Sequence, residues 1–520
     1  MANSNRQQDS RRDSYDGYYS DDRLPRRFSA DEYDAADRRT GNAPPARPRP
    51  AADDRPHGKA PAAPAPRADR NTDNTAYDMK GSRNILIALV CVVAAILIIA
   101  ALLANSGKGD DKVQQTPSAH QQGTVITSDT DAVSSADTAV TPDTPAPPAA
   151  VMKLPEPTPI TDEAVISKLD SIAKRHSLFT AQIATIKDGE VSCTYEYGTV
   201  DKESDRRPDS DTKMRVASLS KVITGITAMS MAEKGILDLD ADVSTIAGYT
   251  IRNPYYPKSP ITMRTLLCHT STISTVNLDV NAKYTTDLTW LPSKLKTNKP
   301  YTKHTPGKAS AFEYSNSGYC IAGYLQEKAA GKTLNDYLHE NFLDRMGIDA
   351  AFCASQLKDT GNIAALRSNE AKSYGMTVDL QLTRPYYGAG DNSYPYAGDY
   401  MTSAKDFARM LCILINDGTY NGTQFLSAET VSSMLTHQVN IGNRNTPRMQ
   451  CITLKHYEQQ LNGMDLYYHT GGAIGVQGYA AFNKDTRDGV VILTIGSDTA
   501  KKRNDVNEVC LAMAEHCFGL

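Results

Sequence analysis

The chain is poor in aromatic residues and carries no surplus of charge of either sign. Its 520 residues include one Trp, nine Phe, 56 Lys and Arg, and 60 Asp and Glu, which leaves a formal net charge of −4. Without a basic surplus, nothing in the composition points to nucleic acid as a partner. The nine Cys form no CxxC and no Cys–His pair at zinc spacing, so the common zinc motifs are excluded as well.

Proline and large apolar side chains are each scarce in one part of the chain. Of the 27 Pro, 17 lie in the first 160 residues, whereas Trp290 and eight of the nine Phe follow residue 160. This division excludes a single globular unit of 520 residues. From residue 159 onward about 360 residues remain, which is enough for one large or two smaller cores and hence for an enzyme-sized domain.

The first 158 residues are predicted to form three segments that carry no chemistry. Residues 1–84 mix Arg and Asp with Pro, Ala and Ser without a hydrophobic period, which predicts a disordered tail. Residues 85–104 are 20 uncharged residues, about 30 Å long as a helix, and lie too far from residue 1 for a signal peptide, so we predict a transmembrane helix. Residues 105–158 are rich in Ser, Thr and Pro, which predicts a flexible linker.

Basic residues on the two sides of this span predict its orientation. Four precede it and two follow it closely, namely Arg67, Arg70, Lys80 and Arg83 against Lys108 and Lys112. The positive-inside rule therefore places the N-terminus in the cytoplasm, with a single pass through the cell membrane and residues 159–520 on the extracytoplasmic side. The eight Cys of that part are permitted to form disulfides there, although their spacing fixes no pairing.

Residues 159–520 have the pattern of an α+β domain. A helix is predicted over Thr161–His176 with Thr161 as its N-cap, followed by a hairpin of two strands over 178–186 and 191–200. A second hairpin is predicted over 475–482 and 490–495, followed by a C-terminal helix from Val506. We therefore expect an antiparallel sheet flanked by helices, with a mostly helical subdomain formed between residues 218 and about 450.

The pattern Ser-x-x-Lys at Ser218-Leu-Ser-Lys221 has the spacing of a serine nucleophile and its base. On a helix, Lys221 lies on the same face as Ser218, one turn away. A desolvated amine can remove the proton from a serine hydroxyl, and a helix N-terminus favours an oxyanion there. The pattern alone is weak, because it recurs at Ser171/Lys174, Ser210/Lys213, Ser293/Lys296 and Ser355/Lys358.

Two further motifs strengthen the interpretation of Ser218. Tyr314-Ser-Asn316 is the only YxN of the chain, and His469-Thr-Gly-Gly472 is also unique. In this order the three motifs resemble those of the serine penicillin-recognising enzymes, which include penicillin-binding proteins, DD-peptidases, class C β-lactamases and related esterases. The resemblance extends over roughly residues 159–520 and includes Leu266-Leu-Cys-His-Thr-Ser271. One departure is Thr272, where the family commonly has Gly.

This resemblance implies a role for each matching residue. Ser218 is expected to attack a carbonyl and form an acyl-enzyme, with Lys221 activating it and Tyr314 relaying protons. The backbone N–H groups of Ser218 and Gly472 are expected to form the oxyanion hole. The two remaining motifs supply Asn316, expected to bind the substrate amide, and His469 with Thr470, expected to help position a terminal carboxylate. The resemblance implies no metal and no organic cofactor.

Several other polar residues are interpreted as structural. His269 is expected to be a hydrogen-bonding residue of its loop, and Asp399 and Asp406 are expected to act as a cap and a helix start. Arg444 and Arg448 are expected to be solvated loop charges.

Three hypotheses for function follow. The first is a membrane-anchored D-Ala-D-Ala carboxypeptidase or penicillin-binding protein that acts on cell-wall peptides and binds β-lactams covalently. The second keeps the same machinery in an esterase, a D-amino-acid amidase or a β-lactamase, acting on another small acyl substrate. The third is a β-lactam-sensing module that does not turn over and signals through the cytoplasmic tail.

Overall fold

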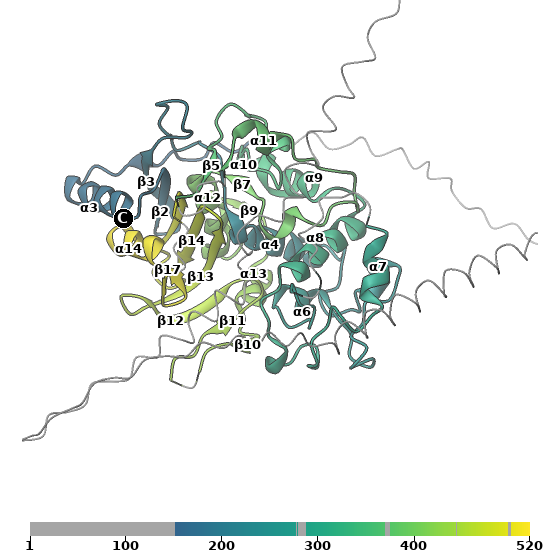
Figure 1. Ribbon diagram of the computed structural model, residues 1–520. Helices are drawn as coiled ribbons and strands as arrows, with labels where there is room; N and C mark the ends of the chain where they lie inside the picture. Colours follow the sequence, from purple (N-terminus) through teal and green to yellow (C-terminus); the bar gives the residue numbers. More distant parts are fainter. Residues whose placement is uncertain (1–150, 277, 279–287, 370–374, 444, 498–500) are drawn as a thin grey trace, which may run out of the picture. The chain divides into compact units, whose positions relative to one another are not determined.

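The computed structural model describes most of the chain from residue 151 to the C-terminus. The described residues are 151–520 without 277, 279–287, 370–374, 444 and 498–500 (Figure 1). The predicted tail, the predicted transmembrane helix at 85–104 and the linker up to residue 150 lie outside them. Within the described part, no helix is long and apolar enough to cross a membrane.

A nine-stranded sheet forms the centre of the domain, with the strand order β1-β3-β2-β15-β14-β13-β12-β11-β10. Its strands are β1 (Thr158–Pro159), β2 (Thr180–Lys187), β3 (Glu190–Gly198), β10 (Val439–Asn440), β11 (Met449–Gln450), β12 (Lys455–Leu461), β13 (Met464–Ala473), β14 (Val476–Phe482) and β15 (Gly489–Ile495). Neighbouring strands are antiparallel except β1 and β3, which are parallel, so the sheet is mixed and not wholly antiparallel as predicted. Helix α3 (Glu163–Arg175) and β2 lie between β1 and β3 in the chain, and a parallel pair needs such a long connection in place of a tight turn.

Helices cover both faces of this sheet. On one face, α3 contacts α14 (Glu508–Cys517), and the two lie side by side in Figure 1. On the other face, α12 (Ala404–Ile415) contacts β2, β3 and β15. Both faces of the sheet are apolar, because successive side chains along β15 point to opposite faces. Val490 and Ile492 join the core beneath the terminal helices, whereas Val491 and Leu493 join the core beneath α12.

The N-cap of α3 differs from the prediction. The carboxylate of Asp162 accepts hydrogen bonds from the N–H groups of Ala164, at 2.8 Å, and Val165, at 3.2 Å. Asp162 has extended backbone angles, so it stands directly before the first helical residue, where a cap must be. The cap is therefore Asp162 and not Thr161.

Most of the remaining elements form the mostly helical part, on the right in Figure 1. Its helices are α4 (Ser220–Glu233), α5 (Ser244–Ala247), α6 (Met263–Leu267), α7 (Trp290–Leu295), α8 (Asn316–Ala330), α9 (Leu334–Leu338), α10 (Asp344–Met346), α11 (Val378–Leu382) and α13 (Ala428–Leu435), with short turns η2 (Ala217–Leu219), η4 (Ala309–Ala311), η5 (His339–Leu343), η6 (Ala354–Gln356) and η7 (Pro395–Ala397). Two-residue strands pair as β4 (Met214–Arg215) with β7 (Met401–Thr402), β5 (Leu366–Arg367) with β6 (Gly375–Met376), β8 (Thr419–Tyr420) with β9 (Thr423–Gln424), and β16 (Lys502–Arg503) with β17 (Val506–Asn507). Helix α4 is buried nearly all round, which explains why its sequence is apolar on every face.

The folded domain begins before residue 159. The N–H of Met152 donates to the carbonyl of Arg345 at 2.8 Å, and the carboxylate of Glu156 pairs with Lys405 and Arg409 on α12. The last residues of the predicted linker therefore belong to the domain. Each of its eight cysteines is a free thiol.

Candidate active site

Ser218 lies in the tight turn η2 directly before α4, two residues before the first residue of the helix, Ser220, and not at its N-terminus as predicted. The turn is fixed by Ser220, whose hydroxyl donates to the carbonyl of Ala217 at 2.6 Å and accepts from the N–H of Tyr400 at 2.9 Å. Ala217 has φ +49, a conformation that non-glycine residues rarely adopt. The turn leaves the side chain of Ser218 partly exposed, while Lys221, in the first turn of α4, is fully buried.

Lys221 is directed at Ser218. Its Nζ donates hydrogen bonds to Oγ of Ser218 at 3.0 Å and to the carbonyl oxygen of Ala397 at 2.6 Å. The ring of Tyr314 lies on another side, with its centroid 5.0 Å from Nζ. No carboxylate of the described residues forms an ion pair with Lys221, and burial lowers its pKa to about 7. At neutral pH a large fraction of this amine is uncharged and able to accept a proton.

Tyr314 completes the cluster around Ser218. Burial raises the pKa of the Tyr314 hydroxyl, and a hydrogen bond with Ser218 opposes the rise. The hydroxyl therefore stays protonated at physiological pH, as a proton relay requires. Two residues later, Asn316 begins α8 with a partly exposed side chain, and Ser315 caps the helix by accepting from the N–H of Gly318 at 2.9 Å.

His269 contacts the segment that carries Tyr314 and Ser315. Its Nδ1 accepts a hydrogen bond from the N–H of Ser315 at 3.0 Å, and its ring centroid lies 4.4 Å from that of Tyr314. The prediction of a structural hydrogen-bonding residue is confirmed. In the same loop Thr272 has φ +70, the left-handed conformation that glycine adopts at no cost, and Nδ2 of Asn253 donates to its hydroxyl at 2.9 Å.

The third motif lies on β13, against the turn that carries Ser218. A Cβ on Gly471 would lie 2.5 Å from the carbonyl oxygen of Val216, so the missing side chain allows this close approach. Strand β12 pairs with β13 only as far as Tyr468, whereas β14 pairs with it through Ala473. The edge from His469 to Ala473 therefore has a strand neighbour on one side within the described residues. Thr470 on this edge is partly exposed and Gly472 is exposed.

His469 is buried and uncharged. Burial lowers its pKa to about 3, and the positive charges of Lys221 and Lys455 act in the same direction. Its Nδ1 lies 2.8 Å from the carbonyl oxygen of Thr470 and must carry the proton, because a carbonyl only accepts. His469 therefore offers a substrate the acceptor Nε2 and no positive charge.

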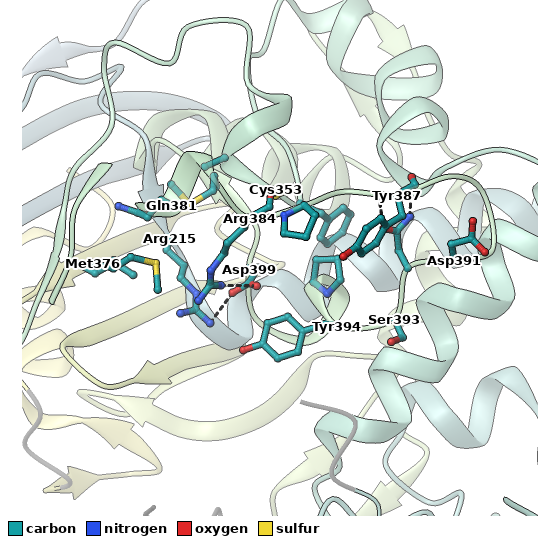
Figure 2. Close-up of a pocket in the computed structure, with 17 residues that line it drawn as sticks. Arg215, Cys353, Met376, Gln381, Arg384, Tyr387, Asp391, Ser393, Tyr394 and Asp399 are labelled. Atoms are coloured by element: carbon teal, nitrogen blue, oxygen red, sulfur yellow. Dashed lines mark hydrogen bonds and ion pairs between the residues drawn. The ribbon is translucent and has the colours of Figure 1, made fainter. Parts of the chain in front are cut away.

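A cavity is lined by residues that flank Ala397 in the sequence, among them Pro395 and Asp399. Asp399 on its wall forms ion pairs with Arg215 at 2.6 Å and with Arg384 at 2.8 Å, as the dashed lines in Figure 2 indicate. The prediction that Asp399 is a cap is wrong, because its carboxylate bridges two arginines. Ser218 and Lys221 do not line this cavity.

Two further predictions concern charged residues. Asp406 is confirmed as part of a helix start, since it lies in the first turn of α12, where it pairs with Arg409 at 3.0 Å. Arg448 pairs with Asp505 at 3.7 Å, so it is not a free solvated charge, and Arg444 lies outside the described residues.

No sequence pattern indicated that the carbonyl of Ala397 is a partner of Lys221. A backbone acceptor has no side-chain signature, and 176 residues separate the two positions. Only the packing of η7 against α4 brings them together.

Part of this chain is similar in sequence to known proteins. The chain is 24% identical to Protein flp of Staphylococcus aureus (strain N315) over 243 residues, 45% of each chain. It is 26% identical to the D-alanyl-D-alanine-carboxypeptidase/endopeptidase AmpH of Escherichia coli (strain K12) over 200 residues, 36% of this chain and 50% of AmpH. The matches thus span about half the length of these relatives.

Among solved structures, a class C β-lactamase from Rhodobacter sphaeroides has the same fold. It superposes with a TM-score of 0.51 and 19% identity over 68% of this chain and 98% of that chain. The model of the family described as "Beta-lactamase" matches residues 165–511. This match covers more than half of the chain and includes all three motifs. The chain therefore belongs to the beta-lactamase family, within the superfamily of serine β-lactamases and penicillin-binding proteins.

Proposed function

We propose that this chain is a membrane-anchored serine hydrolase that acylates Ser218 and releases D-alanine from cell-wall peptides ending in D-Ala-D-Ala. The observation that carries the proposal is the distance of 3.0 Å between Nζ of Lys221 and Oγ of Ser218, in a site where burial lowers the pKa of Lys221 to about 7. An amine with this pKa suits a general base at neutral pH.

In the proposed acylation, Oγ of Ser218 attacks the carbonyl carbon of the terminal peptide bond while its proton passes to Nζ of Lys221. The N–H groups of Ser218 and Gly472 stabilise the negative charge that develops on the carbonyl oxygen. Tyr314 relays this proton from Nζ to the leaving nitrogen, the C–N bond breaks, and D-alanine departs. Water then attacks the acyl ester, its proton passes through Lys221 and Tyr314 to Oγ of Ser218, and the ester C–O bond breaks, which regenerates the Ser218 hydroxyl.

The proposed substrate contacts follow the motif positions. Asn316 binds the amide of the acyl part, and the hydroxyl of Thr470 donates a hydrogen bond to the terminal carboxylate. His469 helps to position this contact without donating to the carboxylate, because its only proton lies on Nδ1 and is held by the carbonyl of Thr470. The choice of a D-Ala-D-Ala peptide is supported by the likeness to AmpH, whose name states that activity.

Release of D-alanine from a peptide ending in D-Ala-D-Ala tests the proposal, with full-length protein and Ser218→Ala as the matched control. We expect release by the wild type and none by the variant. Hydrolysis of nitrocefin or short acyl esters without release of D-alanine would instead indicate a β-lactamase, an esterase or an amidase. A lasting penicillin adduct on Ser218, found by mass spectrometry without turnover of any substrate, would favour the sensor hypothesis.

The proposed location is the outer side of the cell membrane, with residues 85–104 as the anchor. The support is the uncharged 20-residue run and the basic residues before it. Protease added to intact cells should degrade the domain and leave an epitope tag at the N-terminus intact. Protection of the domain would overturn this location.

A further inference from the structure

Glu327 is a fully buried carboxylate that lies outside the three motifs. It belongs to α8, the helix that begins at Asn316, and its exposed fraction is 0%. Among the described residues it has no basic partner in an ion pair. A buried charge without a counter-charge is costly, by several kcal/mol, unless hydrogen bonds compensate for the lost water. The burial of Glu327 therefore depends on its hydrogen-bond donors.

The compensating donors come mainly from one segment, residues 386–396. The hydroxyl groups of Tyr386, at 3.2 Å, and Tyr396, by a short contact, donate to Oε1, and the N–H of Gly390 donates to Oε2 at 3.0 Å. Nδ2 of Asn392 lies 3.2 Å from both oxygens. These donors oppose the rise that burial causes in the pKa of Glu327. The carboxylate thus ties a whole loop to α8.

The loop held in this way ends at the backbone acceptor of Lys221. Tyr396 precedes Ala397, whose carbonyl oxygen accepts from Nζ of Lys221 at 2.6 Å. The carbonyl of Tyr396 itself accepts from the hydroxyl of Thr224, one turn further along α4, at 2.8 Å. The ring of Tyr396 lies on Gly323 of α8, where a Cβ would come within 2.0 Å of Cδ2. Tyr396 is therefore fixed at its ring, its hydroxyl and its carbonyl.

From this geometry we infer that Glu327 is a positioning residue, which through Tyr396 holds the carbonyl of Ala397 against Nζ of Lys221. The inference rests on the proposed acylation of Ser218 by the Lys221 mechanism. Among the described residues, Glu327 makes no hydrogen bond with Ser218 or Lys221, and it acts through the loop alone. With the carbonyl in place, Nζ has one fixed acceptor and keeps its direction toward Oγ of Ser218.

Loss of the carboxylate has two consequences for Lys221. In Glu327→Gln the amide NH2 group faces a backbone N–H in either orientation, that of Gly390 at Oε2 or that of Leu334 at Oε1, and it faces Nδ2 of Asn392 in both, so the hold on the loop is weakened. Nζ then loses its orientation, which slows acylation, and its ammonium form loses an acceptor, which lowers the pKa of Lys221 below about 7. The other titratable groups around Lys221 are Tyr314, which precedes α8, Tyr319 and Cys320 on α8, and the two histidines His269 and His469. Burial keeps both histidines uncharged, so the acidic limb of the pH profile reports Lys221.

The test measures the rate at which a fluorescent penicillin acylates full-length protein across the pH range. We expect Glu327→Gln to slow acylation by about tenfold to a hundredfold and to move the midpoint of the acidic limb to lower pH. Tyr396→Phe, which removes only the hydroxyl, and Gly323→Ala, which displaces the ring, are expected to change the rate and the midpoint in the same direction. These two variants keep the test decisive if Glu327→Gln does not fold.

Tyr400→Phe is the matched control, because the hydroxyl of Tyr400 is buried and has no hydrogen-bond partner among the described residues. It should retain the wild-type rate and midpoint. If the wild type is acylated and the folded variants of Glu327, Tyr396 and Gly323 all behave like Tyr400→Phe, the inference is overturned while the proposed function stands. If the wild type is not acylated at Ser218, the proposed function fails, and the inference fails with it.

Discussion

Replacing Lys221 by Met is expected to stabilise the fold near neutral pH while abolishing acylation. Burial lowers the pKa of Lys221 from 10.5 to about 7, so between these values the unfolded chain binds a proton that the folded chain does not. Wild-type stability therefore rises with pH across this window. The destabilisation caused by Lys221 is fully present below about pH 7 and disappears as the pH approaches 10.5.

The size of this destabilisation follows from the difference between the pKa of Lys221 in the unfolded and in the folded chain. A difference of one in pKa corresponds to about 1.4 kcal/mol. Lys221 therefore lowers the free energy of unfolding by about 5 kcal/mol near pH 6 and by less than about 1 kcal/mol near pH 10. Methionine has a similar length and no charge to desolvate. The advantage of Lys221→Met over the wild type in the free energy of unfolding should thus grow by about 4 kcal/mol from pH 10 to pH 6.

Urea unfolding followed by tryptophan fluorescence measures this difference. Trp290 is the only Trp of the chain and lies on α7, so the signal of the full-length protein reports this domain alone. Lys174→Met is the control, because the Lys174 side chain is 68% exposed and its removal should give no comparable pH dependence. A difference between Lys221→Met and the wild type that stays constant with pH would refute the assignment of a desolvated amine.

Three further outcomes are expected. Tyr314→Phe should slow acylation by about a hundredfold or more with little change in unfolding free energy, as measured with a fluorescent penicillin and by urea titration, because it removes a proton relay; an unchanged rate would exclude that role. Gly471→Ala should reduce both acylation and stability, since its Cβ would lie 2.5 Å from the carbonyl oxygen of Val216, whereas full activity would show that β13 can move freely. His469→Gln should leave the midpoint of the acidic limb in place, because burial lowers the pKa of His469 to about 3 and it carries no charge there; a displaced midpoint would contradict a neutral imidazole.

Local patterns predicted much of the fold. The two hairpins and the terminal helices were recognised because alternation and helical spacing are written in neighbouring residues, as along β15. The parallel pairing of β1 was missed because two residues carry no directional signal, and the cap of α3 was misplaced by one residue because Thr161 and Asp162 are both suitable caps.

By itself, the sequence determined which side chains are available for chemistry. Ser218, Lys221, Tyr314 and His469 were singled out because motif spacing is a property of the chain alone. The tertiary structure decided their electrostatic state and their backbone partners, because burial and long-range contacts exist only after folding. It lowers the pKa of Lys221, leaves His469 uncharged, and brings the carbonyl of Ala397 to an amine 176 residues away.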